Sequence, residues 1–353
     1  MEATRPFAGG GFEDRIAVVV NGNAKRVTDD LVDTLSQIVR DGDLFVSRTL
    51  EEGEDIARTI TERGYHTVLT GGGDGTFVHM VTLLVKQARA AGKRPPRFGL
   101  LRLGTGNALA WVLGAGQGVV ADLARIRREA GSSKLKVIEV DGKITPFAGM
   151  GIDGIALNDY NRVKDAMGRI PVLRPFAGGG LAYLVSIAGV TAPSYLLRKR
   201  QHVRIVNTGA PAERIGPDGQ PDGPPIPTGA TLFDGKARAV AVGTIPYYGF
   251  GVRIFPFAAD REDRMNLRIV DTNVVEVGVH IREIWKGRYR SPNFMDYFVE
   301  KAHIEFEPPT ALQIGGDPAG VRESVDVAMA EPIDVVDFYA PPAALGSSEE
   351  TSR

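Results

Sequence analysis

Residues 67–90 combine the patterns of a strand, a glycine-rich turn and a helix in direct succession. Thr67 to Thr70 form a short β-branched run, and the apolar residues between 77 and 85 recur with helical spacing. Between them lies the sequence Gly-Gly-Asp-Gly-Thr at residues 72–76. Glycine lets a backbone approach an anion closely, and the start of a helix offers free N–H groups and the positive end of its dipole. The stretch therefore predicts an α/β fold with a phosphate-binding turn.

Asp74 is unusual in such a turn because its charge repels phosphate. The position makes sense if Asp74 orients a reacting hydroxyl or holds Mg²⁺. A plain tight turn between strand and helix is the alternative. The turn lacks the lysine of the Walker-type phosphate loop, and it is not the Gly-x-Gly-x-x-Gly dinucleotide fingerprint. A Walker-type ATPase and an ordinary dehydrogenase are therefore disfavoured.

The first third of the chain alternates strand and helix patterns. Continuous apolar runs at 16–20, 44–46 and 98–101 predict further buried strands. Amphipathic segments between them predict helices, one of which is capped by Asp29 or Asp30. This alternation is typical of a doubly wound, mostly parallel sheet, in which ligands bind at the carboxyl ends of the strands.

Two more turns rich in glycine and asparagine follow strands in this region. One spans Asn21–Lys25, where Lys25 could contact a phosphate, and the other spans Leu103–Asn107. In the second turn Thr105 offers a hydroxyl, and Asn107 offers both a donor and an acceptor. Each turn alone is also compatible with ordinary turn chemistry. Because all three glycine-bearing turns follow strands, we expect them to converge on one cleft.

The pattern changes near residue 134. Residues 134–140 and 144–147 flank Asp141-Gly142, which predicts a two-residue hairpin. Later strands, several with alternating polarity typical of antiparallel sheets, are predicted at 203–206, 237–242, 267–270, 302–306 and 333–338. Helical patterns interrupt them at 157–167 and 181–197. Residues 208–229 are rich in Pro and Gly, which predicts an exposed loop or a disordered insert.

The composition limits the classes of function. A chain of 353 residues favours two domains, and a net charge of −1 gives no broad basic surface for nucleic acid. The chain has no cysteine, which excludes disulfides and thiol chemistry. The longest apolar runs are too short to span a bilayer, and the first 15 residues lack the apolar core of a signal peptide. We therefore expect a cytoplasmic protein that would take any lipid ligand from the membrane surface.

The two glycine turns together resemble those of the diacylglycerol kinase-like lipid kinases, which include bacterial diacylglycerol kinases, sphingosine kinases and ceramide kinases. The Gly-Gly-Asp-Gly-Thr turn is also shared, more distantly, with NAD kinases. Supporting matches lie at 149–153, 179–183 and 248–251, so the resemblance covers most of the chain. It implies an α/β nucleotide-binding domain and a C-terminal antiparallel β-sandwich domain, with ATP and substrate meeting between them. The domains would span 14–133, with returning strands at about 326–342, and 134–325, while residues 1–13 and 343–353 would be disordered.

Site residues follow from the resemblance position by position. It implies Mg²⁺ with ATP, and Asp153 near the head group of the substrate. A capping or turn role is the alternative for Asp153. The residues that it places around ATP are Asn21, Gly22, Asn23, Ala24, Lys25, Thr49, Gly72, Gly73, Asp74, Gly75, Thr76, Gly104, Thr105 and Asn107.

The chain departs from the resemblance at three places. The family usually carries Asp-Gly-Glu late in the chain, with the Glu as general base, whereas this chain has Gly315-Gly316-Asp317. Asp317 keeps a carboxylate but is shorter by one carbon–carbon bond, about 1.5 Å. At the start of the helix after the first turn, Val78-His79 replaces the common Asn-Glu. The third departure lies in the loop that forms a structural Mg²⁺ site in some bacterial members, where the matching residues are Ala259, Glu262 and Arg264.

The resemblance implies an ATP-dependent lipid kinase that phosphorylates a primary hydroxyl. Asp317 would be the catalytic base, aided by Asp74, and an apolar groove that includes 181–190 and Tyr247-Tyr248 would hold acyl chains. Those apolar residues are equally compatible with a core. Diacylglycerol, a sphingoid base and ceramide all remain open as acceptors, and so does a homodimer. The rival hypotheses are an NAD-kinase-like enzyme with a soluble substrate, and a non-catalytic nucleotide- or lipid-binding protein.

Overall fold

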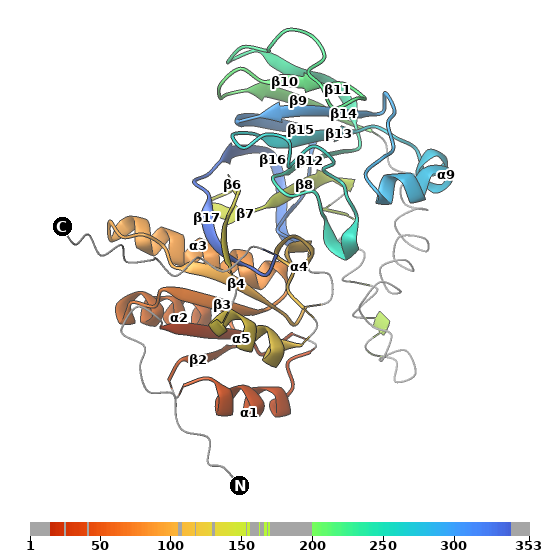
Figure 1. Ribbon diagram of the computed structural model, residues 1–353. Helices are drawn as coiled ribbons and strands as arrows, with labels where there is room; N and C mark the ends of the chain where they lie inside the picture. Colours follow the sequence, from red (N-terminus) through yellow and green to blue (C-terminus); the bar gives the residue numbers. More distant parts are fainter. Residues whose placement is uncertain are drawn as a thin grey trace, which may run out of the picture.

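The computed structural model describes residues 15–24, 26–40, 42–104, 108–116, 118–128, 131–152, 154–155, 162, 166–167, 169 and 200–339. These residues form two sheets with helices around the first (Figure 1). The first sheet has the order β2-β1-β3-β4-β17-β5. Its strands are β1 (Ile16–Asn21), β2 (Leu44–Ser47), β3 (Thr67–Gly72), β4 (Arg97–Arg102), β5 (Gly131–Leu135) and β17 (Ile333–Asp337). The pairs among β1 to β4 and β17 are parallel, and β5 pairs antiparallel with β17, which confirms the predicted mostly parallel sheet.

Helices lie between the strands of the first part, as the alternating pattern predicts. They are α1 (Asp29–Ile38), α2 (Leu50–Arg63), α3 (Asp74–Ala90), α4 (Ala108–Leu113) and α5 (Val119–Arg128). The predicted cap of α1 is wrong, because the hydroxyl of Thr28 accepts the N–H of Leu31, and Asp29 and Asp30 lie in the first turn. Aspartate there still favours the helix through its dipole.

The second sheet is antiparallel, as predicted. It has 11 strands among the described residues, and its bent strand β15 pairs with β16, β8 and β9. Buried side chains from both branches of this sheet, among them Val240, Leu267, Ile205 and Ile304, pack in one cluster, so the sheet folds over its own core. Its strands are β6 (Ile138–Val140), β7 (Lys143–Thr145), β8 (Phe147–Gly151), β9 (Gln201–Asn207), β10 (Glu213–Ile215), β11 (Thr231–Ala237), β12 (Ala239–Gly243), β13 (Met265–Val270), β14 (Phe294–Val299), β15 (Lys301–Ile314) and β16 (Asp317–Met329).

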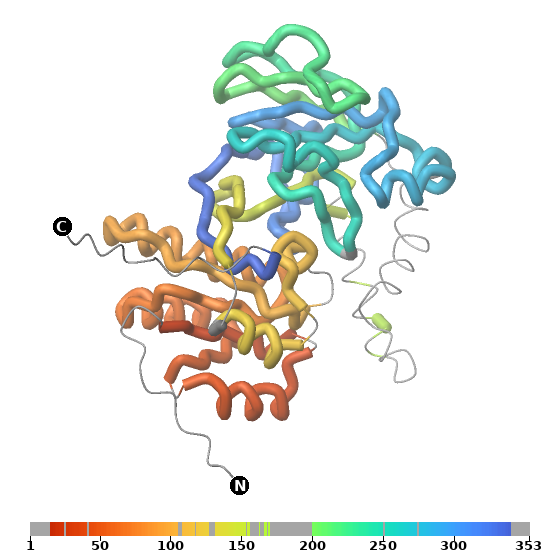
Figure 2. The backbone as a smooth tube through the Cα atoms, viewed as in Figure 1, coloured from red at the N-terminus to blue at the C-terminus, as the bar shows by residue number. Residues whose placement is uncertain are grey.

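Three details of the second part differ from the prediction. The strand expected at 134–140 is split, because β5 pairs in the first sheet and β6 in the second. Residues 208–229 are not a disordered insert: β10 lies there, and the side chain of Asn207 donates to the carbonyls of Ala210 and Ile226. The return to the first sheet starts after β16, which stays in the second sheet up to Met329 (Figure 2). The helical patterns predicted at 157–167 and 181–197 lie almost entirely outside the described residues.

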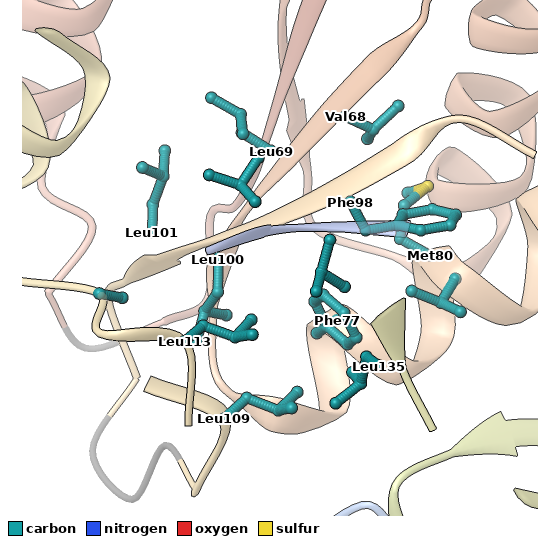
Figure 3. Close-up of a cluster of buried hydrophobic side chains, with 14 of the residues drawn as sticks. Val68, Leu69, Phe77, Met80, Phe98, Leu100, Leu101, Leu109, Leu113 and Leu135 are labelled. Atoms are coloured by element: carbon teal, nitrogen blue, oxygen red, sulfur yellow. The ribbon is translucent and has the colours of Figure 1, made fainter. Parts of the chain in front are cut away.

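Helix α3 lies between the two sheets and contacts both. Phe77 and Met80 pack on the first sheet, where the ring of Phe77 meets that of Phe98 edge-on at 6.2 Å (Figure 3). On another side of the helix, Val78 belongs to the core of the second sheet, and the hydroxyl of Thr82 accepts the N–H of Ile144 at 2.9 Å. The glycine turn at the start of α3 is therefore held from both sides.

Candidate functional site

The start of α3 has the geometry of an anion site. The helix begins after Gly73, and its first intrahelical bond runs from the N–H of Phe77 to the carbonyl of Gly73. By helix geometry, the N–H groups of residues 74–76 have no acceptor within the helix. A Cβ atom on Gly72 would lie 2.4 Å from Oγ1 of Thr76, so only glycine lets Thr76 fold back over the turn. Phosphate oxygens fit N–H groups presented in this way.

The ends of three parallel strands meet at this turn, as the sequence predicts. Nδ2 of Asn21, at the end of β1, donates to Oγ1 of Thr76 at 3.1 Å. The N–H of Gly104, after β4, donates to the carbonyl of Gly72 at 2.7 Å. Lys25, Thr105, Gly106 and Asn107 lie outside the described residues.

The turn after β1 is held to the loop after β2. The N–H of Asn23 donates to Oδ1 of Asn21 at 2.9 Å, and Nδ2 of Asn23 donates to the carbonyl of Arg48 at 2.6 Å. Ala24 closes the turn through its N–H to the carbonyl of Asn21, and the N–H of Gly22 bonds to the carbonyl of Ser47. These contacts fix Asn21, the residue of this turn that reaches Thr76.

Thr49 caps helix α2. Its hydroxyl accepts the N–H of Glu52 at 3.2 Å, and the carboxylate of Glu52 accepts the N–H of Thr49 in return. This capping box satisfies two backbone donors of the first turn. The structure therefore gives Thr49 a local role, and its predicted contact with ATP stays a prediction.

The carboxylate of Asp74 points to the start of α4. Oδ2 accepts the N–H of Ala108 at 2.7 Å, and Oδ1 accepts the N–H of Leu109 at 3.2 Å. The side chain thus joins the first glycine turn to the helix after the second one. This contact answers the objection that its charge repels phosphate, because the carboxylate is directed at α4. Burial raises the pKa of Asp74 to about 7, the two N–H donors lower it, and the charge of Asp317 raises it further.

Asp317 meets the same glycine turn from the second sheet. It is the first residue of β16, and it pairs with Ile314 across a two-residue turn in which Gly315 has φ 60° and Gly316 φ 85°. A Cβ atom on Gly75 would lie 2.0 Å from Oδ2 of Asp317, so the exposed carboxylate lies directly against the start of α3. Residues separated by more than 240 positions thus form one site.

Two of the departures from the resemblance lie in contact with each other. A Cβ atom on Gly315 would lie 2.5 Å from Cγ2 of Val78. The aspartate that the family usually has at position 315 would therefore collide with Val78. His79, the neighbour of Val78, comes close to Gly53 of α2: its Nε2 atom lies 2.9 Å from the position that a Cβ atom on Gly53 would occupy. Burial lowers the pKa of His79. His79 is therefore packed against α2.

Gln313, which the sequence reasoning did not assign to the site, supports the hairpin together with Tyr248. Gln313 is buried, accepts the N–H of Gly316 at 2.9 Å and donates to the hydroxyl of Tyr248. The ring of Tyr248 packs on Phe147 at 4.7 Å and on Phe255 at 5.8 Å. A glutamine in an apolar run, two residues before a glycine turn, is the signal that could have identified this support. Tyr248, predicted as a groove or core residue, is thus attached to the core.

The loop with the predicted structural metal site contains a lysine. Nζ of Lys136 donates to the carbonyl of Ala258 at 2.9 Å and to that of Arg261 at 2.5 Å. The guanidinium of Arg264 pairs with Asp263, and Ala259 and Glu262 are exposed. Among the described residues, no three His, Asp or Glu side chains gather around a metal position. The ammonium group of Lys136 already donates to two carbonyls of this loop. The proposed reaction therefore has no step at a metal in this loop, and the predicted ligands stay a prediction.

Most of the predicted substrate end of the site lies outside the described residues. Asp153, the match at 179–183 and the apolar run 181–190 lie outside the described residues. Tyr247 is half-buried, and its ring packs at 6.2 Å against Trp111 of α4 and lies under the guanidinium of Arg253. Tyr247 therefore lies at the boundary between the two parts of the molecule.

Comparison with known proteins agrees with this geometry. Residues 15–140 match the family model of the diacylglycerol kinase catalytic domain. The first part of the chain is thus similar to that catalytic domain. The match contains β1 to β4, both glycine turns and the pair formed by Asp74 and α4.

Solved structures extend the likeness to almost the whole chain. Three structures from Bacillus anthracis str. Sterne, one named as a diacylglycerol kinase and two as a "putative diacylglycerol kinase", match 93% of this chain and 98% of their own chains. Their TM-scores are 0.63, 0.57 and 0.60, with sequence identities of 15%, 16% and 17%. At such identities the likeness shows the fold. The chain has no match among curated protein sequences. No helix among the described residues is both long and apolar enough to cross a bilayer.

Proposed function

We propose that this protein is an ATP-dependent lipid kinase that phosphorylates a primary hydroxyl of a lipid such as diacylglycerol, a sphingoid base or ceramide. The observation that carries the proposal is the contact between Asp317 and Gly75. It brings an exposed carboxylate from the second sheet to a helix start suited to phosphate. Phosphoryl transfer depends mainly on positioning and charge neutralisation, which such a junction supplies.

In this proposal the backbone N–H groups of residues 74–76 bind the terminal phosphates, and Asn21 and Thr76 fix the shape of the turn. A divalent cation bound with the nucleotide would neutralise phosphate charge. Asp74 would hold it, directly or through water, and a buried carboxylate with a pKa raised to about 7 is a group that a nearby cation would ionise. Asp317 accepts the proton from the lipid hydroxyl as that oxygen attacks the phosphoryl group.

The test is phosphate transfer from radiolabelled ATP to a mixed lipid extract, with mass-spectrometric identification of the product. We expect one labelled lipid phosphate with wild-type protein and none with Asp317→Asn. NAD serves as a second acceptor in parallel. Labelled NADP without labelled lipid would establish the NAD-kinase-like alternative, and ATP binding without transfer to either acceptor would establish a non-catalytic protein.

A further inference from the structure

Helix α9 (Val274–Trp285) is attached to the second sheet by its polar side. The carboxylate of Glu276 accepts hydrogen bonds from Tyr289 at 2.9 Å, from Ser291 at 2.8 Å and from Nδ2 of Asn293 at 2.8 Å. One helical turn later, the ring of His280 stacks on that of Tyr289 at 4.4 Å. These polar and aromatic contacts lie on the inward side of the helix, where Val277 and Ile284 are also half-buried.

The opposite side of α9 is exposed and carries two valines on one stripe. Val275 and Val279, one turn apart, are 70% and 71% exposed. Ile281 is 48% exposed but comes two residues after Val279, which places it on another side of the helix. A Cβ atom on Gly278 would meet nothing within 4 Å. Single exposed apolar residues are ordinary, but neighbouring ones on one helical stripe are typical of an interaction surface.

The same exposed stripe becomes basic toward the end of the helix. Arg282 and Lys286 continue the spacing of Val275 and Val279 and are exposed. Residues 274–290 contain four basic and two acidic residues, whereas the whole chain has a net charge of −1. Both acidic residues are engaged, Glu276 in the network described above and Glu283 with Arg288 at 3.0 Å. The charge available at this surface is therefore positive and complements an anionic one.

A chain of contacts joins α9 to the candidate site. The carbonyl of Trp285 accepts the N–H of Arg253 at 2.9 Å, and the guanidinium of Arg253 lies over the ring of Tyr247. Tyr247 packs on Trp111, which is 51% exposed and belongs to α4, the helix whose start is bound by Asp74. Tryptophan, tyrosine and arginine are common at the level of lipid head groups. Figure 1 shows α9 at the outer edge of the second sheet.

We propose that α9 docks the protein on the surface of an anionic phospholipid bilayer. The exposed side chains of Val275 and Val279 enter the boundary between head groups and acyl chains, and Arg282 and Lys286, on the same stripe, bind lipid phosphates. An amphipathic helix that lies in the interface binds by this combination of apolar burial and charge. The inference deepens the proposed function, since it names the surface from which the lipid is taken, but vesicle binding itself needs no catalysis.

The test is co-sedimentation of the full chain with vesicles of phosphatidylcholine and roughly 30 mol% phosphatidylglycerol. The phosphatidylglycerol gives the vesicles about the negative charge of a cytoplasmic leaflet. We expect the double variant Val275→Asp/Val279→Asp to lose at least about 10-fold in partition, because it replaces apolar burial by charge. Arg282→Gln/Lys286→Gln should lose binding to these vesicles but not the weak binding to pure phosphatidylcholine. Val321→Asp is the matched control, because Val321 is 62% exposed on β16, far from α9 in sequence, and should bind like wild type.

Unchanged partition of both double variants would overturn the proposal. It would also be overturned if gel filtration showed a wild-type dimer that Val275→Asp/Val279→Asp converts to a monomer, because α9 would then bind a second copy of the chain. Circular dichroism checks that the variants fold. Phosphorylation of a dispersed short-chain diacylglycerol separates this inference from the proposed function. Variants that lose vesicle binding but keep full activity on the short-chain lipid would support docking. A wild-type protein that binds vesicles but has no kinase activity would contradict only the proposed function.

Discussion

Asp74 and Asp317 lie on either side of Gly75, yet their surroundings are opposite. Asp74 is 9% exposed and accepts two backbone N–H groups of α4, whereas Asp317 is exposed at the end of a hairpin. Burial raises the pKa of Asp74 to about 7. The difference shows how one residue type serves two purposes. A buried carboxylate with fixed partners holds two turns together, and an exposed carboxylate on a rigid hairpin can meet a substrate.

The largest expected effect belongs to the exposed carboxylate. Asp317→Asn should lower kcat by about 10²- to 10⁴-fold, the usual contribution of a general base. The melting temperature should stay within about 2 °C of wild type, because the side chain is exposed and a surface change of this kind has a small effect. The measurement is steady-state lipid phosphorylation together with thermal unfolding.

Two further variants sharpen this result. Asp317→Glu keeps the carboxylate and should retain measurable activity. Asp326→Asn removes an exposed carboxylate further along β16, where its partner is His303, and should leave kcat unchanged. Equal activities for Asp317→Asn and Asp326→Asn would exclude Asp317 as the base.

The second prediction separates the two carboxylates without changing either one. In Gly75→Ala the new Cβ atom would lie 2.0 Å from Oδ2 of Asp317, so the carboxylate must move away. We expect kcat to fall by about 10²-fold, since small displacements of a catalytic group have costs of this size. Stability should be kept, because alanine is the better helix former.

The control is Gly118→Ala, before α5, where a Cβ atom would make only an ordinary contact of 3.6 Å with Ala121. Wild-type activity in Gly75→Ala would mean that the contact between the hairpin and α3 has no role in the reaction.

The third prediction concerns stability and the buried carboxylate. Asp74→Asn places an amide NH₂ opposite one of the two backbone N–H groups at the start of α4, so one hydrogen bond is lost and a buried donor is left without an acceptor. We expect the free energy of unfolding at pH 4, where the contribution of Asp74 is full, to fall by about 1–3 kcal/mol, and we expect kinase activity to be lost. Urea unfolding checks this, with Asp317→Asn as the exposed counterpart. Equal stability of the two variants would contradict the assigned difference in burial.

The fourth prediction is a slope of stability with pH. The pKa of Asp74 is about 7 in the folded protein, above its ordinary value of 3.8. Between these values the folded state binds a proton that the unfolded state has released. The contribution of Asp74 to stability is therefore full below about pH 4 and is lost as the pH rises through about 7, with a slope of at most about 1.4 kcal/mol per pH unit. Urea unfolding from pH 4 to 8 should show this trend in wild type and a flatter one in Asp74→Asn.

Local pattern predicted the first sheet well. The apolar runs 16–20, 67–70 and 98–101 are inside β1, β3 and β4, because strands buried on both sides must be continuously apolar. The second part was harder to predict. The chain passes from one sheet to the other between β5 and β6 without any break in its strand pattern, and β14 and β16 were missed, because strand pairing depends on partners far along the chain.

The sequence by itself determined the doubly wound sheet, the glycine turns after its strands and the place of Asp74 in the first of these turns, because backbone conformation and buried periodicity are local properties. Asp317 was expected from the resemblance alone. Only the tertiary structure decided what those carboxylates face. The hairpin of β15 and β16 places Asp317 against Gly75, and the start of α4 takes the carboxylate of Asp74. Such contacts depend on packing between distant segments, and no local pattern specifies that packing. The same holds for which side of α9 faces outward.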